Sequence, residues 1–351
     1  MNRYPLASSP DVQPEGALSA ASGGMSANGA AGLPSVGVVI LNYNGKLLAE
    51  KCVRSVMNCD YSNKEIIVVE NGSTDGSGGY LRAAFPNVVI LEHPQNLGIV
   101  GGRNRGLLEA VRRGCDYVLS LDNDVRIERD SIRELVAVAE SDPRMGVVGP
   151  KTYFDDGSGR IQCAGGRIPY TQNVCAERGS GDVDCGQYDK IEDVDYFPGC
   201  AFLARREVLE RLDLLDETFY GLGYEDTDFC MRAVRSGYRV VYVPRAVMWH
   251  VGSATIGRYS PHKKYCEAVN SVYLVRRYGT LKDRAKFAFF VGFGLIYALI
   301  VQSVRGNHRA VFAKAHGIWD GLRKPRRLGD AGLSGVNLSR EAGSPHLNSG
   351  T

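Results

Sequence analysis

The chain has 351 residues, 44% of them hydrophobic and 23% charged, with a formal net charge of +3. That composition supplies a sizeable core for one large domain or two small ones, and its balanced charge predicts no nucleic-acid partner. The nine cysteines include no CxxC pair and no Cys/His spacing that suits zinc, which argues against a zinc site. Residues 1–35 and 329–351 hold few large apolar residues and are predicted to be disordered tails.

Apolar, β-branched runs predict buried parallel strands in the first half of the chain, at 36–43, 65–70, 87–92 and 116–121. Helices are predicted around them, at 46–57, in a short segment after the turn "NGSTDGSGG", at 99–113 and at 129–140. Strands that alternate with helices at short spacing indicate an α/β fold with a largely parallel sheet and right-handed crossovers.

The second half of the chain is less regular. A further strand is predicted at 145–150, and residues 151–195, rich in Gly, Asp, Cys and Tyr, are predicted to form long loops. Order is expected to return around 197–212. The segment "EDTDFCMRAVRSGY" at 225–238 predicts a helix that Gly237 ends, and the strand "RVVYVP" follows it.

Polar clusters follow three of the predicted strands directly, at 42–44, 70–75 and 122–124. Ligands of such sheets bind outside the carboxyl ends of the strands, so these clusters are expected to converge on one crevice. Asp122 and Asp124 would repel each other there unless a cation lies between them. Hard divalent cations such as Mg²⁺ and Mn²⁺ take carboxylate oxygens, which makes the pair a candidate metal site. The alternative is a helix N-cap or an Asx turn with solvated charges.

Seven motifs in order resemble those of the family 2 glycosyltransferases, at about residues 36–255: "VVILNYNG", "VVENGSTDGS", "NLGIVGGRNRG", "LDNDV", "FPGCAFLARREVL", "GYEDTDFCMRAVRSGYRV" and "HVGSAT". The resemblance is greatest to the rhamnosyltransferase-like branch of cell-surface polysaccharide synthesis. It implies a GT-A fold, a mostly parallel sheet flanked by helices, over residues 36–260. It also implies an inverting, metal-dependent enzyme that uses a nucleotide-sugar donor.

The resemblance further implies which residues contact the donor. They follow the predicted strands or open the helix after "NLG", namely Asn42, Tyr43, Asn44, Glu70, Asn71, Gly98, Gly102, Arg103, Asn104, Asp122 and Asn123. Family members usually carry Asp where this chain has Glu70, but glutamate can also accept a hydrogen bond from a pyrimidine N3–H. The alternatives are a helix N-terminal carboxylate for Glu70 and a plain strand–helix turn for the glycines.

The same resemblance assigns the metal and the chemistry. Asp124 would bind the divalent cation, with Asp122 facing the ribose or a metal-bound water, and His250 would be a further ligand unless it is structural. Asp226 would be the general base of an inverting transfer, and Glu225 would help to hold the acceptor. Both carboxylates also suit simple capping of a helix. Gly199 would allow a close backbone approach near the acceptor.

Residues 261–328 are expected to form a helical extension. Its run "FAFFVGFGLIYALIV" at 287–301 is uncharged but shorter than the roughly 20 residues of a spanning helix, and basic residues flank it. An interfacial helix on an anionic membrane is the first interpretation, with a buried core or dimer helix and a spanning helix as alternatives.

The sequence therefore predicts a glycosyltransferase that is cytoplasmic and peripheral to the inner face of the plasma membrane. The donor is taken to be dTDP-rhamnose, the acceptor a saccharide or polyprenyl-linked lipid, and the cofactor Mn²⁺ or Mg²⁺. A homo-oligomer is compatible with the sequence. The rival hypotheses are a silent carbohydrate- or nucleotide-binding protein on the same fold, and a nucleotidyltransferase.

Overall fold

The apolar runs of the first half form the middle of a mixed sheet in a computed structural model. The model describes residues 32–323 except 172, 220, 222, 253–259 and 305–306. Most of the predicted N-terminal tail and all of the C-terminal one therefore lie outside the described residues. The predicted runs become four strands, β1 (Val36–Asn42), β2 (Lys64–Asn71), β3 (Val89–His93) and β4 (Tyr117–Asp122), in the parallel order β3-β2-β1-β4.

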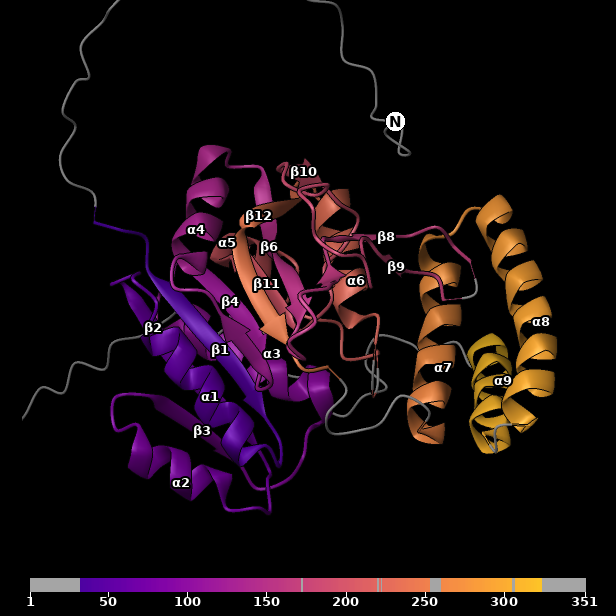
Figure 1. Ribbon diagram of the computed structural model, residues 1–351, viewed down its shortest axis with the longest axis horizontal. Helices are drawn as coiled ribbons and strands as arrows, with labels where there is room; N and C mark the ends of the chain where they lie inside the picture. The colour runs from indigo at the N-terminus through magenta and orange to yellow at the C-terminus, as the bar shows by residue number, and fades with distance from the viewer. Residues whose placement is uncertain are drawn as a thin grey trace, which may run out of the picture. The chain divides into compact units, whose positions relative to one another are not determined.

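Helices cover both faces of this sheet because successive side chains of a buried strand point to opposite sides (Figure 1). Val38 and Ile40 of β1 pack with the helices of one face, α1 (Lys46–Met57), α2 (Ser77–Ala84) and α4 (Ser131–Ser141). Val39 and Leu41 pack with those of the other face, α3 (Gly98–Arg112), α5 (Arg206–Arg211) and α6 (Glu225–Arg235). The predicted α/β class is confirmed.

The second half adds strands of both directions. Next to β4 lies β11 (Ala201–Arg205), antiparallel to it, and beyond follow β6 (Met145–Phe154), β12 (Arg239–His250) and β10 (Glu192–Asp193). Because β6 and β12 are parallel to each other, the sheet remains largely parallel despite the inserted strand. Both strands are longer than predicted, and β12 runs without a break into His250.

The segment predicted as long loops contains short strands. They are β7 (Ile161–Cys163), β8 (Gly166–Arg167) and β9 (Ala176–Glu177), together with β10. Of these, β7 joins the main sheet antiparallel to β6, and β10 joins it antiparallel to β12. A further short strand, β5 (Val125–Ile127), follows the Asp122–Asp124 turn and pairs with the end of β12. That pairing carries the turn toward His250.

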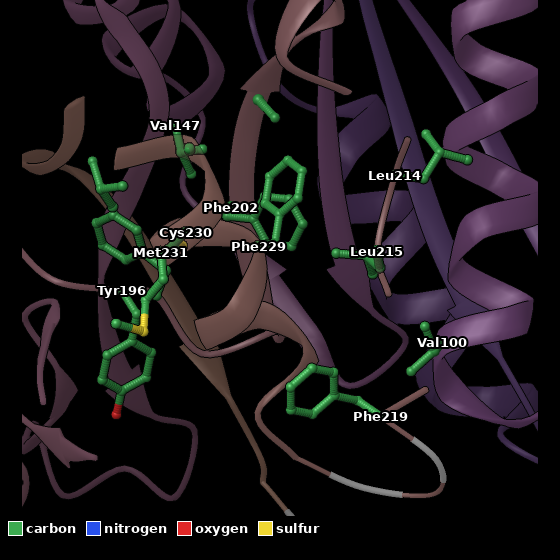
Figure 2. Packing of buried hydrophobic residues seen from close by; sticks show 14 of the residues in the cluster. Val100, Val147, Tyr196, Phe202, Leu214, Leu215, Phe219, Phe229, Cys230 and Met231 are labelled. Atoms are coloured by element: carbon green, nitrogen blue, oxygen red, sulfur yellow. The ribbon is translucent and has the colours of Figure 1, made fainter. Parts of the chain in front are cut away.

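Aromatic packing fixes α6 against the sheet. The rings of Phe202 in β11 and Phe229 in α6 lie 5.7 Å apart between centroids, in a cluster that also contains Tyr196 and Met231 (Figure 2). Such fully buried aromatic side chains contribute much of a core's stability. The first turn of α6, which carries Glu225 and Asp226, is thereby held next to the start of β11, where the N–H of Gly199 contacts Asp226.

The C-terminal extension is helical, as predicted. It consists of α7 (Pro261–Tyr278), α8 (Leu281–Val304) and α9 (His308–Arg323). The hydroxyl of Ser260 caps α7 by accepting the N–H of Lys263 at 3.5 Å, and Pro261 begins the helix at a position where its missing N–H costs nothing.

Helix α7 is bound to α6 through buried charge. The carboxylate of Asp228 accepts hydrogen bonds from the hydroxyl of Tyr278 at 2.6 Å and from Nε of Arg232 at 2.7 Å. Arg277 lies 3.0 Å from the same carboxylate. Since Asp228 is fully buried, these contacts connect the extension firmly to the helix that carries Glu225 and Asp226.

Helix α8 is longer than its uncharged run predicted. It begins at Leu281, because the charged residues before Phe287 continue the helix, and it is long and apolar enough to cross a membrane over Leu281–Gln302. Only 17% of an 18-residue apolar window within it is buried inside the protein. Its buried stripe includes Phe287 and Val291, whereas Phe289, Phe293 and Ile296 are each more than 60% exposed. This exposure does not match a core helix of the described chain.

Candidate active site

The polar ends of β1, β2 and β4 meet, as their parallel pairing requires. Asn42 lies opposite Glu70, and Leu41 lies opposite Asp122. The buried amide of Asn42 donates to Glu70 at 2.8 Å, and its oxygen accepts from the amide of Asn123 at 2.6 Å. Three residues predicted to contact the nucleotide-sugar donor are therefore joined in one hydrogen-bonded network at this edge of the sheet.

The loops after β1 and β2 brace each other. Asn44, in a left-handed backbone conformation, donates its N–H to the hydroxyl of Ser73 and accepts the N–H of Thr74, each at 2.8 Å. Tyr43 beside it is 37% exposed, so its ring is available to a ligand. Asn71 instead stabilises the loop before α3, since its amide contacts Gly98 O and the Leu97 N–H, each at 3.0 Å.

Gly102 and Asn104 in α3 serve packing, whereas Gly98 serves the backbone turn that begins the helix. A Cβ on Gly102 would lie 2.7 Å from Leu41, so glycine is needed for α3 to approach β1. Gly98 opens the helix with a φ of +77° and has open space around it. The amide of Asn104 contacts both the N–H and the C=O of Leu215, which joins α3 to the segment before α6.

Arg103 is the cation at the centre of the site. It is 1% exposed, and its Nη2 contacts Asp122 Oδ1 at 2.5 Å while its Nη1 lies 3.9 Å from Glu225. Nε and Nη1 have no hydrogen-bond partner among the described residues. Burial disfavours the charged guanidinium, but Asp122 and Glu225 raise the pKa of Arg103 above its ordinary value. A buried, undersatisfied cation between two acidic groups suits an anionic ligand.

The Glu225–Asp226 pair opens α6 beside Arg103. The carboxylate of Asp226 accepts the backbone N–H groups of Gly199 and Thr227, each at 2.5 Å. Burial and the neighbouring Asp226 raise the pKa of Glu225 to about 7, and burial also raises the pKa of Asp226. A side chain at Gly199 would displace the guanidinium of Arg103, because its Cβ would lie 2.4 Å from Nη1.

Asp124 and His250 meet across the β5–β12 pairing. Nε2 of His250 lies 3.2 Å from Asp124 Oδ1, and the N–H of Gly252 contacts Asp124 Oδ2 at 3.2 Å. Burial works against the protonated form of His250, but Cys200 and Asp124 raise its pKa to about 11. With Asp122, these residues form a group whose ligand atoms lie within 4.8 Å of one another.

A cavity joins these elements. It is lined by Arg103, Asp122, Gly199, Glu225 and His250 from the predicted set, and by six residues that sequence reasoning did not assign, namely Ile99, Gln162, Cys163, Glu177, Pro198 and Cys200. Three of the six come from the irregular segment after β6, where no periodicity marks them. Pro198 and Cys200 flank Gly199 in the motif "FPGCAFLARREVL", so the sequence could have indicated them as site residues. Asp226 is not among the lining residues, but its carboxylate accepts the N–H of Gly199, which is.

The carboxylate oxygens of Asp122 and Asp124 and the imidazole nitrogen of His250 are suitable ligand atoms for a divalent cation. Two carboxylates and one imidazole are a ligand set that Mn²⁺ accepts, and a cation there would offset the repulsion between the aspartates. A candidate cation site, the buried Arg103 and the Glu225–Asp226 pair of raised pKa therefore lie at or next to one cavity.

Comparison with known proteins agrees with this geometry. Residues 37–213 match the sequence profile of the family described as Glycosyl transferase family 2. An uncharacterised protein of Sinorhizobium fredii, y4gI, is 26% identical over 71% of this chain, which spans only 28% of that protein's length. The low-salt glycan biosynthesis hexosyltransferase Agl10 of Haloferax volcanii is 22% identical over 84% of this chain and 95% of its own length.

A solved structure shares the fold. The mannosyltransferase PcManGT of Pyrobaculum calidifontis, in complex with GDP-Man and Mn²⁺, superposes with a TM-score of 0.54 at 18% identity, over 84% of this chain and 88% of that one. The fold is therefore GT-A-like. Since the profile covers half of the chain, this chain belongs to glycosyl transferase family 2.

Proposed function

We propose that this enzyme transfers a sugar, with inversion, from a nucleotide diphosphate to a saccharide or polyprenyl-linked acceptor. One observation carries the proposal: Arg103 contacts Asp122 of the Asp122–Asp124–His250 group through Nη2, and its Nη1 lies near Glu225 of the Glu225–Asp226 pair. The first group suits the leaving diphosphate, and the second suits the attacking hydroxyl. Rhamnose from dTDP-rhamnose remains the proposed donor, on sequence resemblance alone.

Asp124, His250 and Asp122 would hold the cation, Mn²⁺ or Mg²⁺. When bound, such an ion neutralises charge on the departing diphosphate. Arg103 would assist the same charge from its buried position, because its unpartnered N–H groups are strong donors to phosphate oxygens. Asn42, Tyr43, Asn44 and Glu70 would surround the base and ribose at the adjoining edge of the sheet.

The transfer itself needs a proton acceptor opposite the leaving group. The acceptor hydroxyl oxygen forms a bond to the anomeric carbon, the bond from that carbon to the diphosphate oxygen breaks with its electron pair, and the hydroxyl proton passes to a carboxylate. Asp226 is the proposed base and Glu225 the proposed acceptor contact. Burial raises the pKa of both carboxylates toward the neutral range, where a general base accepts a proton most efficiently.

The C-terminal helices are proposed to dock on an anionic membrane. The exposed aromatic and aliphatic side chains of α8 continue onto α9 as Phe312, Trp319 and Leu322. Residues 276–323 contain nine Lys and Arg against two acidic residues, so the surface is complementary to anionic headgroups. Such a position, on the cytoplasmic face, would bring the cavity close to a polyprenyl-linked acceptor.

Vesicle sedimentation tests the membrane proposal. Wild-type protein should pellet with vesicles that contain phosphatidylglycerol and less with neutral ones, and Phe293→Glu with Ile296→Glu should abolish pelleting. Met57→Glu, at an exposed apolar residue of α1, is the matched control and should pellet normally. Wild-type protein that stays in the supernatant but elutes as a dimer would assign the surface to a second copy instead.

A panel of nucleotide sugars tests the activity. With Mn²⁺ and an acceptor, the enzyme should release a nucleoside diphosphate, and EDTA should stop the release. A nucleotidyltransferase would instead release pyrophosphate, and a binding protein would release neither product. Asp124→Ala should lose cation-dependent turnover, with Asp130→Ala, an exposed aspartate at the start of α4, as its control.

A further inference from the structure

Gln162 contacts the imidazole of His250 on the side away from Asp124. Its Oε1 lies 2.9 Å from Nδ1 of the ring, while Nε2 of the ring faces Asp124 Oδ1 at 3.2 Å. The two residues are 88 positions apart in the chain, so the contact belongs to the tertiary fold. Gln162 also lines the cavity, together with His250 and Asp122.

The backbone around Gln162 is shaped to aim this side chain. Along the β6–β7 ladder, Thr152 pairs with Cys163 and Tyr153 pairs with Ile161, so Gln162 is an extra residue between two paired ones. A bulge of this kind redirects the side chain of the unpaired residue and is common next to active sites. Since β6 also pairs with β12, which carries His250, the bulge is held at a fixed distance from the ring.

The space around the contact is also restricted. Gly252 has a φ of +74°, and a Cβ on it would lie 3.1 Å from Nε2 of Gln162. The N–H of the same glycine contacts Asp124 Oδ2. The residue after Val251 therefore supports Asp124 and leaves room for the amide of Gln162.

Hydrogen-bond chemistry decides what this contact does. An amide oxygen only accepts, so Nδ1 opposite it must carry a proton. A divalent cation bound at Asp124 would take the place of the Nε2 proton of the ring, and an imidazole that keeps its proton on Nδ1 then presents the Nε2 lone pair to the cation. A metal-ligating histidine generally has its second nitrogen held by such an acceptor, which fixes both tautomer and ring orientation.

We propose that Gln162 is a positioning residue that presents Nε2 of His250 to a divalent cation, by accepting the Nδ1 proton through its amide oxygen. The inference rests on the proposed function, because it assumes that the cation site at Asp122, Asp124 and His250 is used. It assigns a role to a residue of the irregular segment after β6. Gln162 touches no reacting atom, so it acts only through His250.

Two substitutions separate this role from a merely structural one. Gln162→Met has similar length and no strong acceptor, whereas Gln162→Glu keeps an acceptor oxygen in the same place. Gln187→Met, at an exposed glutamine of the same segment, is the matched control. His250→Ala sets the largest effect that loss of the ring can have. Folding of each variant is checked by circular dichroism and thermal melting, and Gln162→Ala replaces the methionine variant if that one does not fold.

Binding of MnCl₂ alone is measured by isothermal titration calorimetry, and nitrogen ligation by electron spin-echo modulation of the bound Mn²⁺. We expect Gln162→Met to weaken Mn²⁺ binding by about 10- to 100-fold, without exceeding the loss in His250→Ala, and to reduce the directly coordinated ¹⁴N signal. Gln162→Glu and Gln187→Met should bind about as tightly as wild type.

Three results would overturn the inference. Unchanged Mn²⁺ affinity and ¹⁴N signal in Gln162→Met would show that Gln162 does not orient the ring. Equal losses in the methionine and glutamate variants would show that packing, and not the acceptor oxygen, matters. Wild-type protein that binds no Mn²⁺ would refute the cation site of the proposed function as well, so the two failures can be told apart.

Discussion

Replacing Arg103 with methionine is the perturbation that tests the electrostatics of the site most sharply. The guanidinium is buried and lies 3.9 Å from Glu225, whose pKa is about 7. Coulomb's law gives about 4 kcal/mol for two unit charges at that distance with an effective dielectric constant near 20. Methionine fills much of the same space without charge, so the variant removes this attraction while most packing is kept.

The direction of the effect follows from the sign of the charge. Without the positive charge of Arg103, the ionised forms of Glu225 and Asp226 are less stable. The pKa of each carboxyl group therefore rises. The base must be ionised to accept a proton, so activity is lost at higher pH than in wild type. One pH unit corresponds to about 1.4 kcal/mol. Since water entering near Asp122 screens part of the attraction, we expect the acid limb of the kcat profile to move up by about one to two pH units.

The assay is kcat against pH with saturating donor and acceptor, measured by nucleoside diphosphate release. Arg105→Met, on the same helix, is the control and should leave the acid limb unchanged. A large loss of kcat with no shift of the limb would mean that Arg103 acts only on the diphosphate. An unchanged rate and an unchanged limb would refute the electrostatic reasoning altogether.

Other variants test separate parts of the account. Asp226→Asn should lower kcat by about 10²- to 10⁴-fold with little change in donor affinity, and full activity would reassign the base to Glu225. In wild type, kcat should fall as the pH drops below about 7, because Glu225, whose pKa is raised to about 7, then takes up a proton and no longer helps to hold the acceptor beside Asp226; a flat profile down to pH 5 would contradict this. Tyr278→Phe should cost about 1–3 kcal/mol in urea unfolding, since it removes one donor to buried Asp228. Gly106→Ala should cost about 1–3 kcal/mol in the same assay, because its Cβ would lie 2.3 Å from Val39.

Much of the site could be predicted because it is local to strand ends. The apolar runs define β1, β2 and β4, and parallel pairing then places Asn42, Glu70 and Asp122 at one edge. The contacts of each polar side chain could not be predicted in the same way. Arg103 was predicted to contact the nucleotide-sugar donor. Its burial and its ion pair with Asp122 depend on how α3 packs against the sheet, which the sequence does not show.

The features that could not be predicted depend on contacts between residues far apart in the sequence. Strand β11 enters between β4 and β6 in the opposite direction, which no local pattern signals. Gln162 reaches His250 through a bulge in a segment without periodicity, so its role depends on register alone. The length of α8 was missed for a different reason. Lysine and arginine are good helix formers, so the basic residues before Phe287 extend the helix instead of ending it.

The anomeric configuration of the transferred sugar tests the central claim most directly. In-line attack opposite the leaving diphosphate, with a carboxylate taking the hydroxyl proton, predicts a product whose anomeric configuration is inverted relative to the donor. Proton NMR of the product, made with the donor found in the nucleotide-sugar panel, reads this from the coupling of the anomeric proton or, where that coupling is uninformative, from the one-bond carbon–proton coupling. Inversion in wild type is the predicted result. Retention of the donor's configuration would contradict the single displacement and the roles given to Glu225 and Asp226.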